Sequence, residues 1–298
     1  MSQDPVIVDL HFMDQPEVIA TFLMPAPDGG FVLIESGPGS TLPALQAGVE
    51  AAGFALADLR AVLLTHIHLD HAGAAGELAR RTGATVYAHP EGIRHLADPT
   101  RLLASAARLY REAMDFLWGR MEPVPQAQLR AVGDGETVTV GGLEATALHT
   151  PGHARHHVAW QVGDSVATGD VGGIRMPGSS HVVPPTPPPD LDLEAWRGSL
   201  RRLAGLAPRR LLVTHFGIHD NIESHLRDLE ARLTRWWELA EEVLGSAGDV
   251  GSLEAALTEL DDHDLAAVNA PSSVREQLRA ACPMMLNAAG LVHAWNRI

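Results

Sequence analysis

The stretch Ala61-Val-Leu-Leu-Thr-His-Ile-His-Leu-Asp-His-Ala-Gly73 decides the fold of this chain and points to its chemistry. It opens with an aliphatic run that stops at Thr65, a pattern typical of a short buried strand followed by a loop. Three imidazoles and a carboxylate then follow within one short segment: His66, His68, Asp70 and His71. Buried groups of these types need partners, and together they suit zinc or iron. We therefore interpret the segment as a metal-binding loop rather than as a solvated polar loop.

The spacing inside this loop favours two ions over one. In an extended loop, the alternation of His66 and His68 directs both rings to the same side. Asp70 and His71 come one turn later, so they are expected to face a second ion close to the first.

The composition limits the class of protein. The chain has 298 residues, enough for one large domain or for one domain with an appendage. Hydrophobic residues make up 46% and charged residues 20%, as in ordinary globular proteins. The net charge of −15 repels phosphate backbones, so we expect no nucleic-acid partner and instead a small-molecule substrate.

Cysteine content and hydropathy indicate a compartment. The single cysteine, Cys282, excludes a disulfide framework and is expected to be a buried thiol rather than a nucleophile. The first residues, 1–5, show no basic region followed by an apolar one, and no apolar run reaches membrane-spanning length. We expect a cytoplasmic enzyme without a membrane partner.

Short apolar runs and helical periodicities alternate along the first two thirds of the chain. The predicted strands are 6–12, 18–24, 31–35, 61–64, 85–88, 138–140, 143–148, 158–162 and 166–168. The predicted helices are 41–52, 73–82, 92–97, 100–118 and 193–206. This order predicts an α/β layered core.

The last part of the chain is predicted to be helical. Apolar residues in 222–243 recur at alternating spacings of four and three, which predicts a long amphipathic helix. Further helical pieces are expected at 253–260 and 273–295. We expect the apolar stripe of the long helix to pack on the main domain or on a second subunit, as in a homodimer, rather than to recognise a ligand.

Three more polar segments follow apolar strands. They carry His153 after Thr-Pro-Gly, Asp170 after Thr-Gly, and His215 after Thr. Taken alone, Asp170 beside glycines also suits a simple turn. Four strand ends with ligand-type residues are stronger evidence together than separately. A proline-dense loop, 182–190, lies between the last two segments and is expected either to border the same pocket or to act as a spacer.

Together, the four polar segments resemble the metallo-β-lactamase superfamily of metallohydrolases over residues 18–220. The matching residues, in order, are His66, His68, Asp70, His71, His153, Asp170 and His215. The resemblance implies a four-layer αββα sandwich of two mixed sheets with metals at one edge. We expect a catalytic domain at 1–220 and a helical C-terminal extension at 221–298, an arrangement similar to the glyoxalase-II-like branch.

The resemblance also implies a ligand set and a mechanism. One ion would be held by His66, His68 and His153, the other by Asp70, His71 and His215, with Asp170 bridging them. Two Zn²⁺ per chain are expected, although imidazole and carboxylate also accept iron or manganese. Two cations would lower the pKa of a shared water toward neutrality for attack on an ester, thioester or lactone carbonyl. Asp70 would orient this nucleophile and take its proton.

Some positions depart from the family pattern. His156 and His157 follow His153, where they could support the ligands, contact substrate or form a surface pair. The acyl-homoserine-lactonase members carry a pocket tyrosine between the bridging Asp and the last His. The only tyrosines here, Tyr87 and Tyr110, lie elsewhere, which weakens that assignment.

Two other activities compete with the hydrolase. A mononuclear iron persulfide dioxygenase would need only His66, His153 and Asp170, and the additional ligand-type residues favour two metals without forbidding one. Ribonuclease-type phosphodiester hydrolysis is disfavoured by the net charge of −15 and by the absence of a lysine-rich arm.

Overall fold

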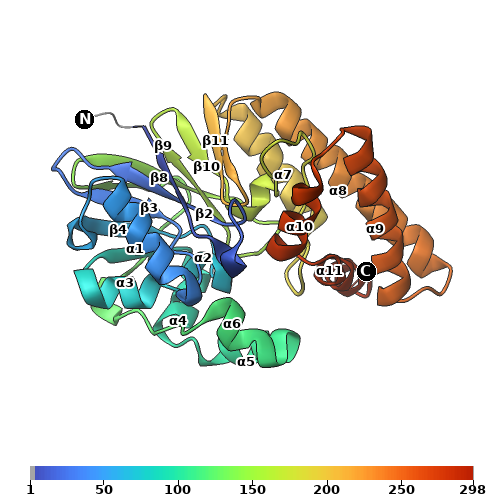
Figure 1. Cartoon of the computed structure of the whole chain (residues 1–298), viewed down its shortest axis with the longest axis horizontal. Coiled ribbons are helices and arrows are strands. Elements are labelled where there is room, and N and C mark those ends of the chain that lie inside the picture. Colours follow the sequence, from blue (N-terminus) through green and yellow to red (C-terminus); the bar gives the residue numbers. More distant parts are fainter. Residues whose placement is uncertain (1–3, 298) are drawn as a thin grey trace.

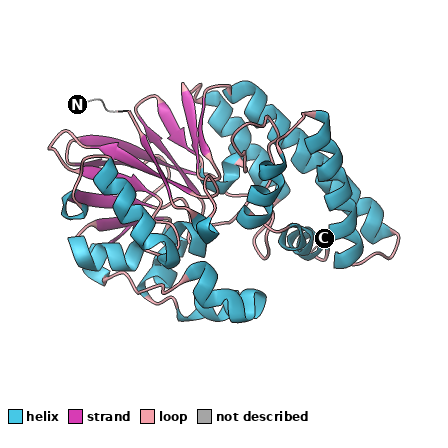
Figure 2. Cartoon of the chain, viewed as in Figure 1, coloured by secondary structure: helices cyan, strands magenta, loops and turns pink. Residues whose placement is uncertain are grey.

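The structure is a computed structural model that describes residues 4–297, and it consists of two β-sheets packed between layers of helices (Figures 1 and 2). The predicted αββα sandwich with a helical C-terminal region is therefore confirmed. In Figure 2 the strands lie in the upper left part of the molecule, with helices below them and to their right.

Each sheet is built from six strands that are consecutive in sequence. The first sheet runs β1 (Val6–Asp9), β2 (Ala20–Pro25), β3 (Phe31–Ile34), β4 (Leu59–Leu63), β5 (Thr85–Ala88) and β6 (Leu129–Ala131). The second runs β7 (Thr137–Val140), β8 (Leu143–His149), β9 (Val158–Val162), β10 (Ser165–Ala167), β11 (Arg210–Val213) and β12 (Gly217–His219). Strands β3 to β6 are parallel to one another, as are β10 and β11, and the other pairs are antiparallel.

Helices connect the parallel strands and cover the sheets (Figure 1). The first sheet is accompanied by α1 (Leu42–Ala51), α2 (Leu69–Ala72), α3 (Ala75–Thr82), α4 (Pro90–Ala97), α5 (Thr100–Tyr110) and α6 (Met114–Trp118). The second half of the chain contributes α7 (Leu193–Gly205), α8 (Ile222–Gly245), α9 (Val250–Ala267), α10 (Ser272–Ala281) and α11 (Met284–Trp295).

The aliphatic run at residues 61–64 forms the end of β4 and the residue after it, and it is buried on both faces of the sheet. Ala61 and Leu63 belong to the core between the two sheets, whereas Val62 and Leu64 belong to the core under the outer helices. Because side chains alternate across a strand, a segment that is covered on both faces is apolar at consecutive positions, as in residues 61–64, whereas Arg60 earlier in β4 is exposed. The run that precedes the polar loop is therefore a central strand, as predicted.

Hydrogen bonds join the two sheets at the end of β4. The Trp160 indole N–H donates to the carbonyl of Leu64 at 3.0 Å. The Val158 amide donates to the Thr65 carbonyl at 2.7 Å. These bonds hold the segment after β4 against the second sheet, so the backbone that carries the following side chains is fixed in place.

Several predicted element boundaries are wrong. The strand predicted at 6–12 ends at Asp9, and the helix predicted at 100–118 is broken at Arg111, whose φ is 47°. No glycine or proline marks that break in the sequence. The helical region predicted at 273–295 divides before Pro283, because the residue before a proline is disfavoured in helical geometry. The short strand β12 was not predicted.

The apolar stripe of α8 packs within the chain. Leu229, Leu233 and Trp236 are fully buried and belong to the same core as residues of the second sheet. The alternative in which the stripe packs on the main domain is confirmed, so the stripe gives no argument for a homodimer. The division into 1–220 and 221–298 stays a prediction, and residues 1–3 and 298 lie outside the described part of the chain.

The proline loop is held against α11 by buried contacts. The Thr186 amide donates to the Asn287 side-chain carbonyl at 2.7 Å, and both residues are buried. At Gly290, an added Cβ would lie 1.8 Å from the Thr186 carbonyl oxygen, so only glycine permits this close approach.

We expect Asn287→Ala to lower the free energy of unfolding by about 1–3 kcal/mol, because the buried Thr186 amide would lose its partner. Urea denaturation followed by circular dichroism measures this change. The matched control is Asn296→Ala at an exposed position near the end of the same helix, which should change the free energy by less than about 0.5 kcal/mol. Equal stability of the two variants would contradict the assignment.

Candidate metal centre

All seven predicted residues meet at one edge of the sandwich. They lie at the ends of strands or directly after them, in the segments following β4, β8, β10 and β11. His66 and His68 occupy the extended segment after β4, whereas Asp70 and His71 lie in the single helical turn α2. The backbone between them thus turns after His68, which directs the two pairs into neighbouring positions.

The first group of side chains is His66, His68, His153 and Asp170. Nε2 of His66 and Nε2 of His153 lie 2.9 and 3.0 Å from Nδ1 of His68. Oδ2 of Asp170 lies 3.3 Å from Nε2 of His153. Three nitrogens and one oxygen therefore converge on one point, which is the donor number and type of a tetrahedral metal site.

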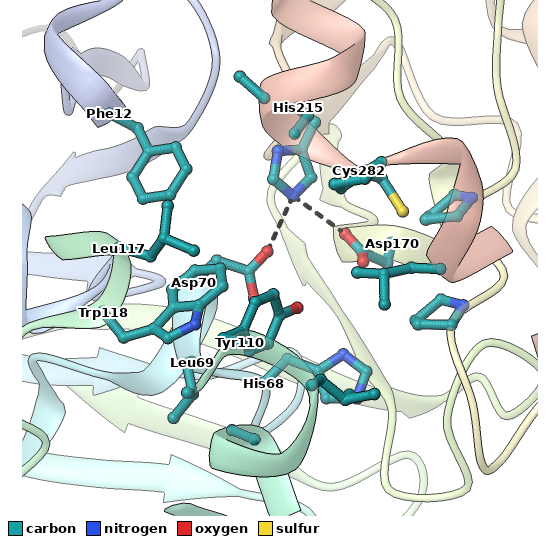
Figure 3. A pocket seen from close by; sticks show the side chains of 18 of the residues that line it. Phe12, His68, Leu69, Asp70, Tyr110, Leu117, Trp118, Asp170, His215 and Cys282 are labelled. Atoms are coloured by element: carbon teal, nitrogen blue, oxygen red, sulfur yellow. Dashed lines mark ion pairs between the residues drawn. The ribbon is translucent and has the colours of Figure 1, made fainter. Parts of the chain in front are cut away.

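The second group is Asp70, His71 and His215. Oδ2 of Asp70 lies 3.5 Å from Nε2 of His71 and 3.5 Å from Nε2 of His215. Oδ1 of Asp170 lies 3.2 Å from Nε2 of His71. It also lies 3.5 Å from Nε2 of His215 (Figure 3). Asp170 thus presents one oxygen to each group.

Unpaired buried atoms show that this donor set fits metal ions. Nε2 of His71 and Oδ1 of Asp170 are buried and have no hydrogen-bond partner among residues 4–297. Buried polar atoms are rarely left unpaired in proteins, and here the two face each other across the second group. A cation bound in the second group would satisfy both atoms.

Electrostatics divide the histidines into two classes. Burial, together with the neighbouring imidazole of His153, lowers the pKa of His68 to about 4. Burial and the His71 and His68 rings hold the pKa of His66 well below its usual value. Burial alone would lower the pKa of His71, but the surrounding carboxylates, Asp170 foremost, raise it well above its usual value. The first group therefore offers neutral nitrogens, whereas the second places imidazole among carboxylates.

The outer nitrogens of His71, His153 and His215 are each fixed by an oxygen. His153 Nδ1 donates to the Pro185 carbonyl at 2.8 Å, and His215 Nδ1 donates to the Val18 carbonyl at 2.9 Å. His71 Nδ1 lies 2.9 Å from Oε1 of Glu35. An outer partner of this kind sets the tautomer, so that the lone pair of the inner nitrogen points toward the site.

Glu35 is the residue that the sequence analysis missed. It is fully buried at the end of β3 and accepts hydrogen bonds from the Thr65 hydroxyl at 2.5 Å and the Thr65 amide at 3.1 Å. The same carboxylate orients His71, and the Thr65 hydroxyl lies 3.0 Å from Nδ1 of His66. Glu35 could also be grouped with His66 and His71 as a metal ligand, but its bond to the outer nitrogen of His71 indicates a supporting role. Its position at the end of a predicted strand, directly before the loop Ser-Gly-Pro-Gly, was the feature of the sequence that could have identified it as a site residue.

His156 and His157 support the ligands rather than forming a surface pair. His157 is fully buried, and its Nδ1 lies 2.8 Å from the Thr150 hydroxyl. The rings of His156 and His157 stack on His66 with centroid distances of 6.3 and 5.2 Å. They therefore restrict the orientation of a predicted ligand.

A cavity of about 560 Å³ opens directly onto the centre. His68, Asp70, Asp170 and His215 form its floor (Figure 3). Its walls come from α5, α6, the proline loop, and α10 and α11 with the residues between them. The prediction that the proline loop borders the same pocket is confirmed. Cys282 also lines this cavity, and burial raises the pKa of its thiol, which keeps it protonated.

Comparison with solved structures supports the architecture. ST1585 from Sulfolobus tokodaii superposes with a TM-score of 0.69 over 98% of this chain and 99% of its own, at 23% identity. The metallo-beta-lactamase family protein TTHA1429 from Thermus thermophilus gives 0.67 over 97% and 90%, at 22% identity. At these identities, the likeness defines the fold: a metallo-β-lactamase sandwich.

The sequence profile described as "Metallo-beta-lactamase superfamily" matches residues 18–215. The chain belongs to the metallo-β-lactamase superfamily.

Curated relatives agree with this membership. The metallo-beta-lactamase fold-containing protein ST1585 of Sulfurisphaera tokodaii is 31% identical over 56% of this chain. The hydroxyacylglutathione hydrolase of Xanthomonas campestris pv. campestris is 31% identical over 63% of this chain. The matches cover 65% and 56% of these relatives, less than two thirds of either protein. Among residues 4–297, no helix combines the length and the hydropathy needed to cross a membrane.

Proposed function

We propose that this chain is a metal-dependent hydrolase that cleaves an ester, thioester or lactone with two ions bound at the candidate centre. The observation that carries the proposal is the placement of Asp170, whose two oxygens face two separate groups of ligand-type side chains. His66, His68 and His153 would hold one ion, and Asp70, His71 and His215 the other, with Asp170 between them.

The reaction adds water across an acyl bond. The carbonyl carbon gains the water oxygen, and its bond to the leaving oxygen or sulfur breaks with the electron pair. One water proton ends on the leaving group, and the other is released from the carboxylic acid product. Divalent ions, when bound, supply this chemistry by lowering the pKa of water toward neutrality and polarising the carbonyl.

Side chains of the protein position and deprotonate the reacting water. Burial opposes ionisation of Asp70, but His71 and His215 outweigh it and lower the pKa of Asp70, so it is a carboxylate at neutral pH. One of its oxygens faces these two histidines, and its side chain lines the cavity. Asp70 can therefore accept the proton of the attacking water.

The relatives named hydroxyacylglutathione hydrolase support a hydrolase related to the glyoxalase-II-like branch. The mononuclear dioxygenase alternative uses only part of the first group. It would leave His71, Asp70 and His215 assembled without a role, so the hydrolase accounts for more of the centre.

We expect about two zinc ions per chain when the protein is purified without added metal or chelator and measured by elemental analysis. Hydrolysis of p-nitrophenyl acetate should disappear after chelation and return on addition of Zn²⁺. One iron per chain, with oxygen consumption on a persulfide, would replace the hydrolase by the dioxygenase. A chain that takes up no metal on titration would contradict both activities.

A further inference from the structure

The cavity over the metal centre is apolar except at its floor and its mouth. Its walls include Leu102, Ala106, Tyr110, Leu117, Trp118 and Leu286. Four prolines from the loop that follows the bridging aspartate complete the wall: Pro185, Pro187, Pro188 and Pro189. A volume of about 560 Å³ is in the usual range for sites that enclose small organic molecules.

Charge is nearly absent from these walls. Outside the predicted metal ligands, the only charged side chains among the lining residues are Glu276 and Arg279, which are exposed and of opposite sign. A substrate with several carboxylates, such as a glutathione thioester, would find one cation there with an anion beside it. A neutral hydrophobic group would bury its surface without leaving a charge unpaired.

The apolar surface continues to the rim of the cavity. Met13 and Leu109 line it and are 37% and 43% exposed, respectively. Large exposed apolar side chains beside a cavity extend the surface on which a hydrophobic chain can rest. The bound group can therefore be elongated and need not end inside the cavity.

Tyr110 places a neutral hydrogen-bond donor at the inner end of this surface. Its ring stands edge-on to Trp118, with centroids 4.9 Å apart and planes at 74°. Its hydroxyl points into the cavity near Asp70, Asp170 and His68 (Figure 3) and makes no hydrogen bond within residues 4–297. Burial, reinforced by the charge of Asp70, raises the pKa of Tyr110, so the group remains a phenol that can donate.

We propose that the cavity binds the hydrophobic acyl group of a neutral ester or lactone, and that the Tyr110 hydroxyl donates a hydrogen bond to its carbonyl oxygen. This inference rests on the proposed hydrolase function and specifies its substrate class. The acyl chain would run from the floor between α5 and the proline loop toward Leu109, and the carbonyl would lie over Asp70 and Asp170.

Binding of a ketone tests the inference without turnover. 2-Nonanone carries a neutral carbonyl and a hydrophobic chain but no bond to hydrolyse, and 2-butanone is its short counterpart. Each methylene that enters the cavity should strengthen binding about fourfold, so we expect calorimetry to give at least about 30-fold tighter binding of 2-nonanone. Tyr110→Phe should weaken both ketones about tenfold through loss of one hydrogen bond.

Two variants on opposite walls test the location of the chain. Ser105→Trp on α5 and Ala280→Trp on α10 would each fill part of the cavity and should abolish the preference for 2-nonanone. Ala107→Trp, at an exposed position of α5 that does not line the cavity, should keep it. Two filling variants are used so that the test still stands if one of them does not fold. An unchanged preference in both would overturn the proposed cavity.

Ester kinetics separate failure of this inference from failure of the hydrolase. With zinc-loaded protein, kcat/KM for p-nitrophenyl octanoate should exceed that for the acetate at least tenfold, and Ala280→Trp should remove this preference. Equal rates for both esters without ketone binding would reject the cavity and leave the hydrolase standing. Ketone binding without hydrolysis of either ester would reject the hydrolase and, with it, the proposed acyl substrate.

Discussion

Asp70→Ala and His68→Ala are each expected to abolish ester hydrolysis while leaving a folded protein. Asp70 is proposed both to hold an ion with His71 and His215 and to take the proton of the attacking water. Loss of a general base alone costs about 10²–10⁴ in rate, so a decrease of at least about 10³ in kcat is expected for Asp70→Ala. His68 contributes the nitrogen around which the first group converges.

Zinc content and kcat should be measured on the same preparations, together with circular dichroism to establish folding. Neither side chain belongs to the two hydrophobic cores, so the fold should persist. Asp220→Ala is the matched control, since Asp220 is exposed and outside the cavity. Full activity of either site variant would refute the proposed mechanism.

Glu35→Gln is expected to weaken zinc binding about 10- to 100-fold, the usual cost of losing an outer partner of a ligand. The carboxylate accepts from the Thr65 amide, the Thr65 hydroxyl and Nδ1 of His71. The glutamine side chain has the same shape but only one oxygen. Its NH₂ group would therefore face one of the donors that the second Glu35 oxygen now accepts from. We also expect a loss of about 1–3 kcal/mol in the free energy of unfolding, because a buried donor would be left unpaired.

Competition with a zinc-binding dye would give the affinity, and urea denaturation of the metal-free protein would give the stability. Glu223→Gln, at an exposed position in the first turn of α8, serves as the control. If Glu35→Gln bound zinc as tightly as the unchanged protein, the carboxylate would have no role in orienting His71.

The sequence allowed the candidate ligands to be predicted because each follows a strand at a chemically distinctive position. A dense polar segment with four ligand-type residues follows the aliphatic run at 61–64: His66, His68, Asp70 and His71. Few structures accommodate that pattern. The same alternation of buried faces made the central strands predictable. Local patterns of this kind predict the site because the end of a strand determines where the next few side chains lie.

Residues that act from a distance could not be predicted in this way. A single glutamate such as Glu35 resembles any exposed carboxylate until its partners on other strands are known. Tyr110 reaches the cavity from α5, and although a helix at 100–118 was expected to border the pocket, no local pattern indicates that this side chain faces the centre. The break at Arg111, which separates α5 from α6, carries no glycine or proline.

The order of strands in the two sheets has a consequence for the newly synthesised protein. His66, His68, Asp70 and His71 follow a strand of the first sheet, whereas His153, Asp170 and His215 belong to the second. On the ribosome, neither proposed site would be complete when the first sheet emerges. At about 5–20 residues per second, roughly 7 to 30 s separate synthesis of His71 from that of His215. Metal uptake would thus be a late step of maturation, and a nascent chain would hold four exposed ligands that bind metal weakly until the second sheet docks.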